Sequence, residues 1–245
     1  MQKRLLRFSG LRGASGLQRN NERFQNLVTH LAPKSATSEM YRMLRTNLDF
    51  ASLDAPLHTV VVTSTVSGEG KTVTASNLAV VNAQAGKRTI IVDGDLRKPM
   101  IHRVFQLSNM TGCTNVLLRQ ANLDDAIQES QVENLDVLTS GPIPPNPAEV
   151  VGSGAMKSLI HSLAERYDLV VVDSPPVLSV ADVKLLSASV DGILYVVGAG
   201  LVTRQALRKA QQSLEMSGAK ILGTVLNQKR LSKSEQQYYY YGYGY

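Results

Sequence analysis

The sequence predicts an α/β fold in one domain, in which helices cover both faces of a mostly parallel central sheet. Short runs rich in Val, Ile and Leu alternate along the chain with segments of helical pattern. These runs are apolar throughout, as are the strands of a parallel sheet that is buried on both faces. The 245 residues are 43% hydrophobic with no Trp and four Phe, which suits one domain with an aliphatic core.

The elements can be predicted in chain order. Residues 37–50 (TSEMYRMLRTNLDF) should form a helix, because Tyr41, Leu44 and Leu48 share an apolar face and Thr37 or Ser38 can cap its start. A second helix is expected over 72–85, after a glycine turn. Strands are expected over 58–65, 89–93, 134–138, 168–173, 192–197 and 219–227, with a proline-rich loop at 141–149.

The chain divides into three predicted parts. Residues 1–34 form a basic N-terminal arm with seven Lys/Arg against one acidic residue, and 35–227 form the folded domain. Residues 228–245 form a flexible tail, whose last eight residues hold six of the nine tyrosines. The arm suits contact with an anionic membrane surface or an acidic partner. A solvated terminus and, less readily, contact with DNA are the alternative interpretations.

Composition excludes several classes of protein. The sole cysteine, Cys113, rules out an intrachain disulfide and a multi-cysteine metal site, and the four histidines lack metal-ligand spacing. The sequence has no run of 18 apolar residues, and its first residues lack the apolar region of a secretory signal. A cytoplasmic protein without a transmembrane helix is therefore expected.

A phosphate-binding loop is predicted directly after the first strand, at 63–72 (TSTVSGEGKT). Gly68 and Gly70 let successive N–H groups point at a phosphate, beside a helix N-terminus. Lys71 would reach the β- and γ-phosphates, and the Thr72 hydroxyl would bind Mg²⁺. The full pattern has glycine where this chain has Thr65, and a plain glycine turn is the alternative. The residues expected to bind the nucleotide here are Ser67, Gly68, Glu69, Gly70, Lys71, Thr72 and Val73.

Acidic residues follow two further strands, at the sheet edge where such folds bind ligands. Asp93 and Asp95 are two positions apart in extended backbone, so they point the same way and can hold Mg²⁺ or accept a proton. Asp173 ends the run DLVVVD, the usual position of a second Mg²⁺-side residue in P-loop enzymes. An Asp-rich turn and a strand-capping aspartate are the respective alternatives. Because three such elements coincide, the sequence predicts a nucleotide-binding site.

From about residue 27 to residue 227 the chain resembles the P-loop tyrosine kinases of bacterial capsule and exopolysaccharide synthesis. The run VDGDLRKP (92–99) looks like that family's second Walker-type motif. The resemblance implies that Asp93 is the general base toward tyrosine, and that Asp95 supports Mg²⁺ and catalysis. Lys71 and Arg97 complete the expected catalytic residues, and Arg97 would meet a phosphate or an acidic tail segment. The resemblance also implies that Asn227 lies near the adenine. A solvated charge and a turn residue, respectively, are the alternatives for these last two.

The helix SEMYRMLRTNL (38–48) is similar to the family's Glu-x-x-Arg-x-x-Arg helix, which mediates ring-like self-association. Glu39, Arg42 and Arg45 match this motif. From the residues alone, an intrahelical Glu39–Arg42 pair on a solvated face is the alternative.

The final residues YYYYGYGY resemble the family's autophosphorylation cluster, with low-complexity disorder as the alternative. The resemblance implies phosphorylation in trans of Tyr238, Tyr239, Tyr240, Tyr241, Tyr243 and Tyr245. A flexible connector over 228–237 would reach roughly 16–19 Å, enough to enter a neighbouring subunit. Six phosphates would add roughly −9 to −12 charges, which exceeds the net charge of +6. We therefore expect phosphorylation to weaken self-association or contact with a membrane partner.

The sequence thus predicts a Mg²⁺-ATP-dependent tyrosine autokinase of the stand-alone cytosolic type that regulates capsule or exopolysaccharide production. The expected partners are further copies of the chain, a transmembrane polysaccharide co-polymerase that activates it, the inner face of the membrane and a tyrosine phosphatase, without nucleic acid. One alternative is a partition- or positioning-type ATPase, although the signature lysine of those relatives is missing from residues 65–67. The other is a nucleotide-gated assembly module without phosphotransfer.

Overall fold

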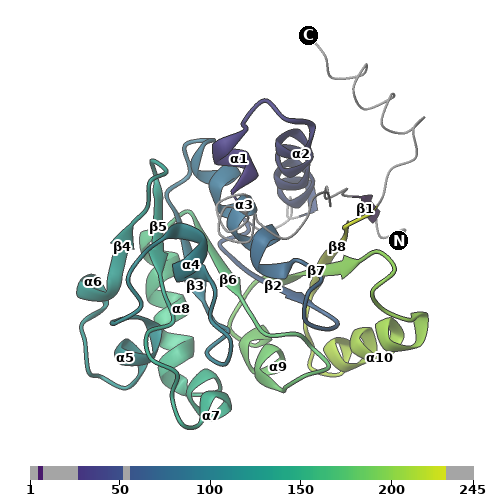
Figure 1. The fold of residues 1–245 in the computed structure, drawn as a ribbon. Helices are drawn as coiled ribbons and strands as arrows, with labels where there is room; N and C mark the ends of the chain where they lie inside the picture. The colour runs from purple at the N-terminus through teal and green to yellow at the C-terminus, as the bar shows by residue number, and fades with distance from the viewer. Residues whose placement is uncertain (1–4, 8–26, 52–55, 230–245) are drawn as a thin grey trace, which may run out of the picture.

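The computed structural model describes residues 5–7, 27–51 and 56–229. Within these ranges the centre of the molecule is an eight-stranded sheet with the order β1-β8-β7-β2-β6-β3-β5-β4 (Figure 1). Neighbouring strands are parallel except for β4 and β5, which are antiparallel. The predicted mostly parallel sheet is therefore confirmed. The strands are β1 (Leu5–Arg7), β2 (Thr59–Ser64), β3 (Thr89–Asp93), β4 (Ile127–Glu129), β5 (Leu135–Leu138), β6 (Leu169–Asp173), β7 (Gly192–Gly198) and β8 (Ile221–Asn227).

Helices cover both faces of this sheet, as predicted. The first face carries α1 to α4 and the second carries α5 to α10 (Figure 1). The helices are α1 (Val28–Leu31), α2 (Ala36–Ala51), α3 (Lys71–Ala83), α4 (Ile101–Phe105), α5 (Cys113–Leu117), α6 (Leu123–Ala126), α7 (Pro147–Val151), α8 (Gly154–Arg166), α9 (Asp182–Ser187) and α10 (Arg204–Glu215).

The continuous apolar strands supply two hydrophobic cores at once. Successive side chains of a strand point to opposite faces, so Val60 and Val62 of β2 enter the core under α2 and α3, while Val61 enters the core under α8 and α9. All six residues of β2 are buried. Burial of each such side chain stabilises the fold by about 1.5–3 kcal/mol. The sheet is therefore packed on both faces, and this packing fixes the positions of the carboxyl ends of its strands.

The folded domain begins earlier than the predicted boundary at residue 35. Residues 28–31 form α1, and the Thr29 side chain is completely buried and donates a hydrogen bond of 2.7 Å to Oδ1 of Asn77 in α3. Leu27 and Val28 pack against the first core. Residues 5–7 also lie in the predicted arm, and they pair as β1 with the edge of β8. The predicted division at residue 35 therefore cuts through folded structure.

The start of α2 differs from the prediction as well. Ser35, and neither Thr37 nor Ser38, takes the capping role, because the Ser35 hydroxyl accepts the backbone N–H of Ser38 at 3.2 Å. Ser38 is completely buried, and its hydroxyl donates to the carbonyl of Ala32 at 2.7 Å. The helix therefore begins at Ala36, one residue before the predicted start.

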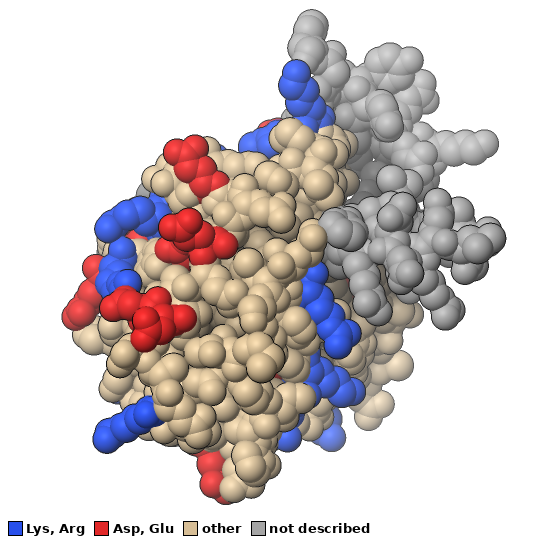
Figure 2. Space-filling view, turned by 60° about the vertical axis from the view of Figure 1, so that its left-hand side comes forward, with Lys and Arg blue, Asp and Glu red and all other residues tan. Residues whose placement is uncertain are grey.

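Among the described helices none is long and apolar enough to span a bilayer. Figure 2 shows one face of the molecule, on which acidic and basic side chains lie side by side along one edge and a wide uncharged area adjoins them. The tyrosines at 238–245 and most of the basic arm lie outside the described residues.

Candidate active site

The predicted phosphate loop lies between β2 and α3, in the required order of strand, loop and helix. Gly68 and Gly70 have φ of +91° and +89°, a conformation that side-chain-bearing residues rarely adopt. A Cβ at Gly70 would also collide with the side-chain amide of Asn227. Lys71 is the first residue of α3, so the loop ends where the helix N-terminus carries its partial positive charge.

The Glu69 side chain holds this loop from inside the protein. Its side chain is completely buried, and its carboxylate accepts the N–H of Val66 and the N–H of Gly198, both at 2.8 Å. The loop is thereby fixed to the end of β7. Glu69 was predicted among the ATP-binding residues, but its carboxylate is turned toward the protein and only its backbone remains for a ligand.

The end of β8 holds the same loop from the side. The Asn227 amide donates to the carbonyl of Glu69 at 2.9 Å, and the Gln228 amide donates to the carbonyl of Gly68 at 2.9 Å. Asn227 thus lies at the phosphate loop, and its expected place near the adenine stays a prediction. Both amides fix carbonyl groups, which leaves N–H groups of the loop for an anion.

Thr65 occupies the position where the full loop pattern has glycine. The Thr65 side chain is completely buried, and its hydroxyl lies 2.7 Å from the hydroxyl of Tyr195 in β7. Each hydroxyl therefore satisfies the other inside the protein. The departure from the motif is accommodated by this contact, and the loop keeps its place after β2.

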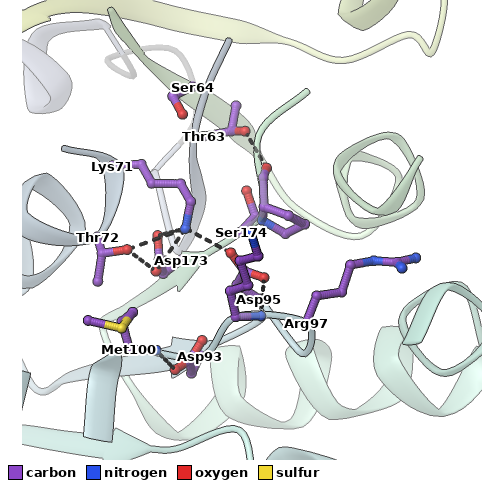
Figure 3. A network of polar contacts seen from close by, with 12 residues as sticks. Thr63, Ser64, Lys71, Thr72, Asp93, Asp95, Arg97, Met100, Asp173 and Ser174 are labelled. Atoms are coloured by element: carbon purple, nitrogen blue, oxygen red, sulfur yellow. Dashed lines mark hydrogen bonds and ion pairs between the residues drawn. The ribbon is translucent and has the colours of Figure 1, made fainter. Parts of the chain in front are cut away.

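Lys71 lies at the centre of the predicted acidic residues (Figure 3). Its Nζ is 3.0 Å from Oδ2 of Asp95 and 3.4 Å from Oδ2 of Asp173. The Thr72 hydroxyl donates to Oδ2 of Asp173 at 2.6 Å. Asp173 ends β6, Asp95 follows β3, and Lys71 and Thr72 begin α3, so three segments meet at one sheet edge. The structure brings together the residues predicted to bind phosphate and metal.

The site holds more negative than positive charge. Burial raises the pKa of Asp173, and the Lys71 ammonium opposes that shift. Burial lowers the pKa of Lys71, but the carboxylates of Asp173 and Asp95 outweigh it and raise that pKa above its ordinary value. Lys71 therefore stays protonated, and its single positive charge faces the carboxylates of Asp95 and Asp173. Such a site favours a further cation.

Asp93 lies beside this cluster in a different environment. It is completely buried, and its Oδ2 accepts the N–H groups of Met100 and Ile101 at 3.0 and 2.9 Å. Its Oδ1 has no hydrogen-bond partner among the described residues. Burial, with the neighbouring Asp173 charge, raises the Asp93 pKa to about 7, despite the opposing N–H of Ile101. A carboxyl group with this pKa can accept a proton near neutral pH.

Arg97 pairs with a residue at the end of a neighbouring loop and not with the Lys71 cluster. Its guanidinium points away from Lys71 (Figure 3) and pairs with the Asp182 carboxylate through Nε at 2.9 Å and Nη2 at 3.2 Å. Asp182 is the first residue of α9 and is completely buried. In this arrangement Nε and Nη2 of Arg97 are engaged by a buried partner and not by the Lys71 cluster.

The residues predicted for self-association lie half-buried on α2. Arg42 pairs with Glu39 at 2.9 Å and also donates to the carbonyl of Pro33. Nη1 of Arg45 donates to the carbonyl of Val81, near the end of α3, at 2.8 Å. Within one chain, the three side chains therefore make contacts of their own.

Several site residues were not predicted from the sequence. Tyr195 and Asp182 come from segments far along the chain, and their partners Thr65 and Arg97 are 130 and 85 residues away. The only local signal was the position of Asp182 at a helix start, which is common for acidic residues without any function.

The donor set suits Mg²⁺. A hydroxyl and two carboxylates are hard oxygen ligands, and Mg²⁺ is usually held by one or two carboxylates together with phosphate oxygens. Within the described ranges, no three or more His, Cys, Asp and Glu side chains form a cage for a metal ion. One hydroxyl and two carboxylates leave coordination positions for phosphate oxygens, so the residues fit Mg²⁺ bound together with a nucleotide.

The strand–loop–helix arrangement, with Lys71 and Thr72 facing acidic residues on neighbouring strands, defines a P-loop nucleotide-binding enzyme. The AAA domain family matches residues 57–217. The tyrosine-protein kinase YwqD of Bacillus subtilis is 46% identical over 218 residues, which cover 89% of this chain and 92% of the relative. The chain belongs to the family of bacterial tyrosine-protein kinases.

Solved structures agree with this assignment. The chimerical protein CapA2B2 has a TM-score of 0.85 and 39% identity, covering 94% of this chain and 96% of that one. The septum site-determining protein MinD of Pyrococcus horikoshii, complexed with Mg-ADP, is more distant, with a TM-score of 0.60 and 27% identity over 73% of each chain. The kinase domain of the Escherichia coli tyrosine kinase ETK, with a TM-score of 0.84 and 32% identity over 93% of this chain and 91% of that one, is nearer to this chain than this MinD is.

Proposed function

We propose that this kinase transfers the γ-phosphoryl group of Mg²⁺-ATP to the tyrosines of its own C-terminal cluster, in trans between copies of the chain. The observation that carries the proposal is the convergence of Lys71, Thr72, Asp95 and Asp173 at the end of a phosphate loop. Phosphoryl transfer needs positioning and charge neutralisation more than covalent participation. This cluster offers both.

Each residue takes a definite role toward the nucleotide. The N–H groups of 67–73 bind the phosphates, and Lys71 leaves its carboxylate partners to contact the β- and γ-phosphates. Thr72, Asp95 and Asp173 hold Mg²⁺, directly or through water. When bound, the ion neutralises charge on the phosphate oxygens. Asn227, at the edge of the same loop, lies toward the adenine.

Asp93 is the general base in this proposal. The tyrosine oxygen attacks the γ-phosphorus, the bond from that phosphorus to the β–γ bridging oxygen breaks, and ADP leaves. The tyrosine proton passes to Asp93, whose pKa of about 7 suits it to accept a proton at neutral pH and release it afterwards. The N–H groups of Met100 and Ile101 hold Oδ2 in place, and Oδ1, which has no partner in the described chain, is the oxygen available for the proton.

The proposed acceptors are Tyr238, Tyr239, Tyr240, Tyr241, Tyr243 and Tyr245. A flexible connector over 228–237 with a reach of roughly 16–19 Å is long enough to carry this tail into the site of a neighbouring copy. Glu39, Arg42 and Arg45 would form the contact between copies after exchanging their present partners. The resemblance supports a role in capsule or exopolysaccharide production, with a transmembrane co-polymerase as activator, a tyrosine phosphatase as antagonist, and cytoplasmic placement at the inner face of the membrane.

The first experiment incubates the full chain with Mg²⁺-ATP and maps phosphotyrosine by mass spectrometry. Phosphate is expected on residues 238–245 of the wild type and at a far lower level on Lys71→Met. Lys87→Met is the matched control, because Lys87 also pairs with an aspartate, Asp49, but lies exposed at the other end of the sheet. ATP hydrolysis without phosphotyrosine would favour the partition-type ATPase, and nucleotide binding without turnover would favour the assembly module.

A mixing experiment tests transfer in trans. Lys71→Met supplies an intact tail with little activity of its own, and a variant with all six tail tyrosines changed to Phe supplies activity without acceptors. Phosphate on the Lys71→Met chain is expected only when both are present. If the mixture stays unphosphorylated while the wild type modifies itself, transfer occurs within one chain.

A further inference from the structure

The pair formed by Arg97 and Asp182 joins the two loops that carry the acidic residues of the site. Arg97 lies in the loop between β3 and α4, two residues after Asp95. Asp182 begins α9, at the end of the loop that follows Asp173. The strands that precede these loops, β3 and β6, are neighbours in register, with Asp93 opposite Asp173. The pair therefore ties the loop of Asp95 to the loop of Asp173.

The pair is difficult to break. Two nitrogens of one guanidinium contact both carboxylate oxygens, the strongest geometry for an ion pair in proteins. Asp182 is completely buried, and among the described residues Arg97 is its one ion-pair partner. If Arg97 moved to a phosphate, it would leave a buried carboxylate without a countercharge, which is strongly unfavourable. Arg97 is therefore held in place.

A short chain of bonds connects this pair to Asp95. The backbone N–H of Lys98, the residue after Arg97, donates to Oδ1 of Asp95 at 3.0 Å. The other oxygen of Asp95 faces Lys71. Fixing Arg97 thus fixes the N–H that orients the Asp95 carboxylate. Without the pair, the Lys98 N–H would lose its anchor, and the contact with Lys71 would be left to orient the Asp95 carboxylate.

We propose that Asp182 and Arg97 form a positioning pair, which presets the Asp95 carboxylate for the metal ion before the nucleotide binds. Neither residue touches the transferred phosphate. The inference rests on the proposed function, because it assigns Asp95 to the Mg²⁺ side of that site. It replaces the predicted catalytic role of Arg97 and adds Asp182, 85 residues away, to the residues on which the site depends.

The test measures ADP binding to the full chain by calorimetry, with Mg²⁺ and with EDTA in its place. Loss of a residue that orients a metal ligand costs about 10–100-fold in metal affinity. Arg97→Met and Asp182→Asn should therefore weaken Mg²⁺-ADP binding by about that factor and leave binding in EDTA near the wild-type value. Because the two residues act as one unit, the double variant should be no worse than the more affected single variant. Arg97→Lys, which keeps the charge and loses the fork, should fall between.

A matched control is present at the opposite ends of the same two strands. Arg88 precedes β3 and Asp168 precedes β6, and they pair at 3.0 Å on the surface. Arg88→Met and Asp168→Asn should leave Mg²⁺-ADP binding unchanged. If these controls weaken binding as much as the Arg97 and Asp182 variants do, general loosening of the strands explains the effect and the proposal is wrong.

Kinetic measurements distinguish a positioning role of Arg97 and Asp182 from a catalytic role of Arg97. With tail phosphorylation as readout, the positioning variants should need about 10–100-fold more Mg²⁺ for half-maximal rate and approach the wild-type kcat at saturating Mg²⁺. A lower kcat in Arg97→Lys at saturating Mg²⁺-ATP, with Asp182→Asn unaffected, would make Arg97 a catalytic residue and overturn the proposal.

Should Asp182→Asn fail to fold, the two Arg97 variants still decide between the two roles. If the wild type binds Mg²⁺-ADP without phosphorylating tyrosine, the proposed kinase function fails while the binding test of the pair still stands.

Discussion

The two ends of strands β3 and β6 use the same residue types for different purposes. At the amino ends, Asp168 is exposed, and the hydrogen bond from the Arg88 side chain holds the Asp168 pKa below its ordinary value. At the carboxyl ends, Asp93 is completely buried, and burial raises its pKa to about 7. Both aspartates accept backbone N–H groups. Burial and uncompensated neighbouring charge therefore separate the reactive end of the sheet from the inert end.

The same contrast appears in the bases. Lys87 and Arg88 at the amino ends each face one exposed aspartate, so their charges are balanced locally. Lys71 at the carboxyl ends faces Asp95 and Asp173, with Asp93 nearby. An excess of buried carboxylate is costly in the absence of a ligand and becomes favourable when a cation binds. The site is therefore the end of the sheet at which the buried carboxylates outnumber the basic side chains that face them.

Changing Asp93 to Asn should give the largest effect on activity. The variant keeps an oxygen for the N–H groups of Met100 and Ile101 but cannot accept the tyrosine proton, so kcat should fall about 10²–10⁴-fold. Quantitative phosphotyrosine detection at saturating Mg²⁺-ATP measures the effect. Asp168→Asn, at the other end of the sheet, should leave the rate unchanged. An active Asp93→Asn enzyme would exclude Asp93 as the base.

Asp93 also predicts how stability depends on pH. Its pKa rises from 3.8 in the unfolded chain to about 7 in the folded one. Between these values the folded state holds the proton that the unfolded state has lost, so the free energy of unfolding of the ligand-free wild type should fall as pH rises from about 4 to about 7. Asp93→Asn cannot lose this proton, and its stability should exceed that of the wild type increasingly over the same window, by on the order of 1–4 kcal/mol at pH 8. Denaturant unfolding at a series of pH values measures the gap, and a constant gap would contradict the burial argument.

Lys71→Met should give the next largest effect, a fall in kcat of about 10²–10³-fold, because a charged donor to the transferring phosphoryl group is lost. In the absence of nucleotide the variant also leaves Asp95 and Asp173 without their cation, so its unfolding midpoint in urea should drop at neutral pH. Lys87→Met removes an exposed partner and should change neither quantity. Equal effects of the two lysine variants would remove the contrast between the ends of the sheet.

Tyr195→Phe should have a moderate effect on stability. It removes the hydroxyl that lies 2.7 Å from the Thr65 hydroxyl inside the protein. A buried polar atom left without its partner costs about 1–3 kcal/mol, which urea unfolding can resolve. The accompanying change Thr65→Val removes the second hydroxyl, and the double variant should recover part of the loss. If it loses stability additively instead, the two hydroxyls do not act as a pair.

The smallest effect is expected from Arg88→Met. This side chain is exposed, and ion pairs of exposed residues contribute little to stability. Its unfolding midpoint and its kcat should be indistinguishable from those of the wild type. A clear loss of activity would show that the amino ends of the strands communicate with the site.

Most of the sheet could be predicted from the sequence, because its strands are continuous apolar runs. Strand 89–93 was predicted with its observed ends, and the other five predicted strands lie within two residues of theirs. The short edge strands β1 and β4 were missed: β4 holds no apolar run, and the pairing of both strands depends on a neighbour. The cap of α2 was also mispredicted: Ser35 accepts the N–H of Ser38, and the Ser38 hydroxyl donates to the carbonyl of Ala32.

The site divides in the same way. Lys71, Thr72, Asp95 and Asp173 were predictable, because strand ends and a glycine loop fix their positions locally. The direction of the Arg97 side chain was not, since Asp182 lies 85 residues further along the chain and nothing near Arg97 indicates it. Nor does the loop sequence reveal that the Glu69 carboxylate turns inward to the N–H of Gly198. Roles set by sequence-distant buried partners need the folded structure.

The contact of Thr65 with Tyr195 has a consequence for how such chains diverge. A glycine at position 65 would restore the full loop signature but leave the buried Tyr195 hydroxyl without its hydrogen-bond partner. A phenylalanine at 195 would leave the Thr65 hydroxyl without one. Mutational drift at either site is therefore conditional on the other. Homologues should carry the threonine together with the tyrosine, or neither, and a search for the loop signature alone will overlook those that keep both.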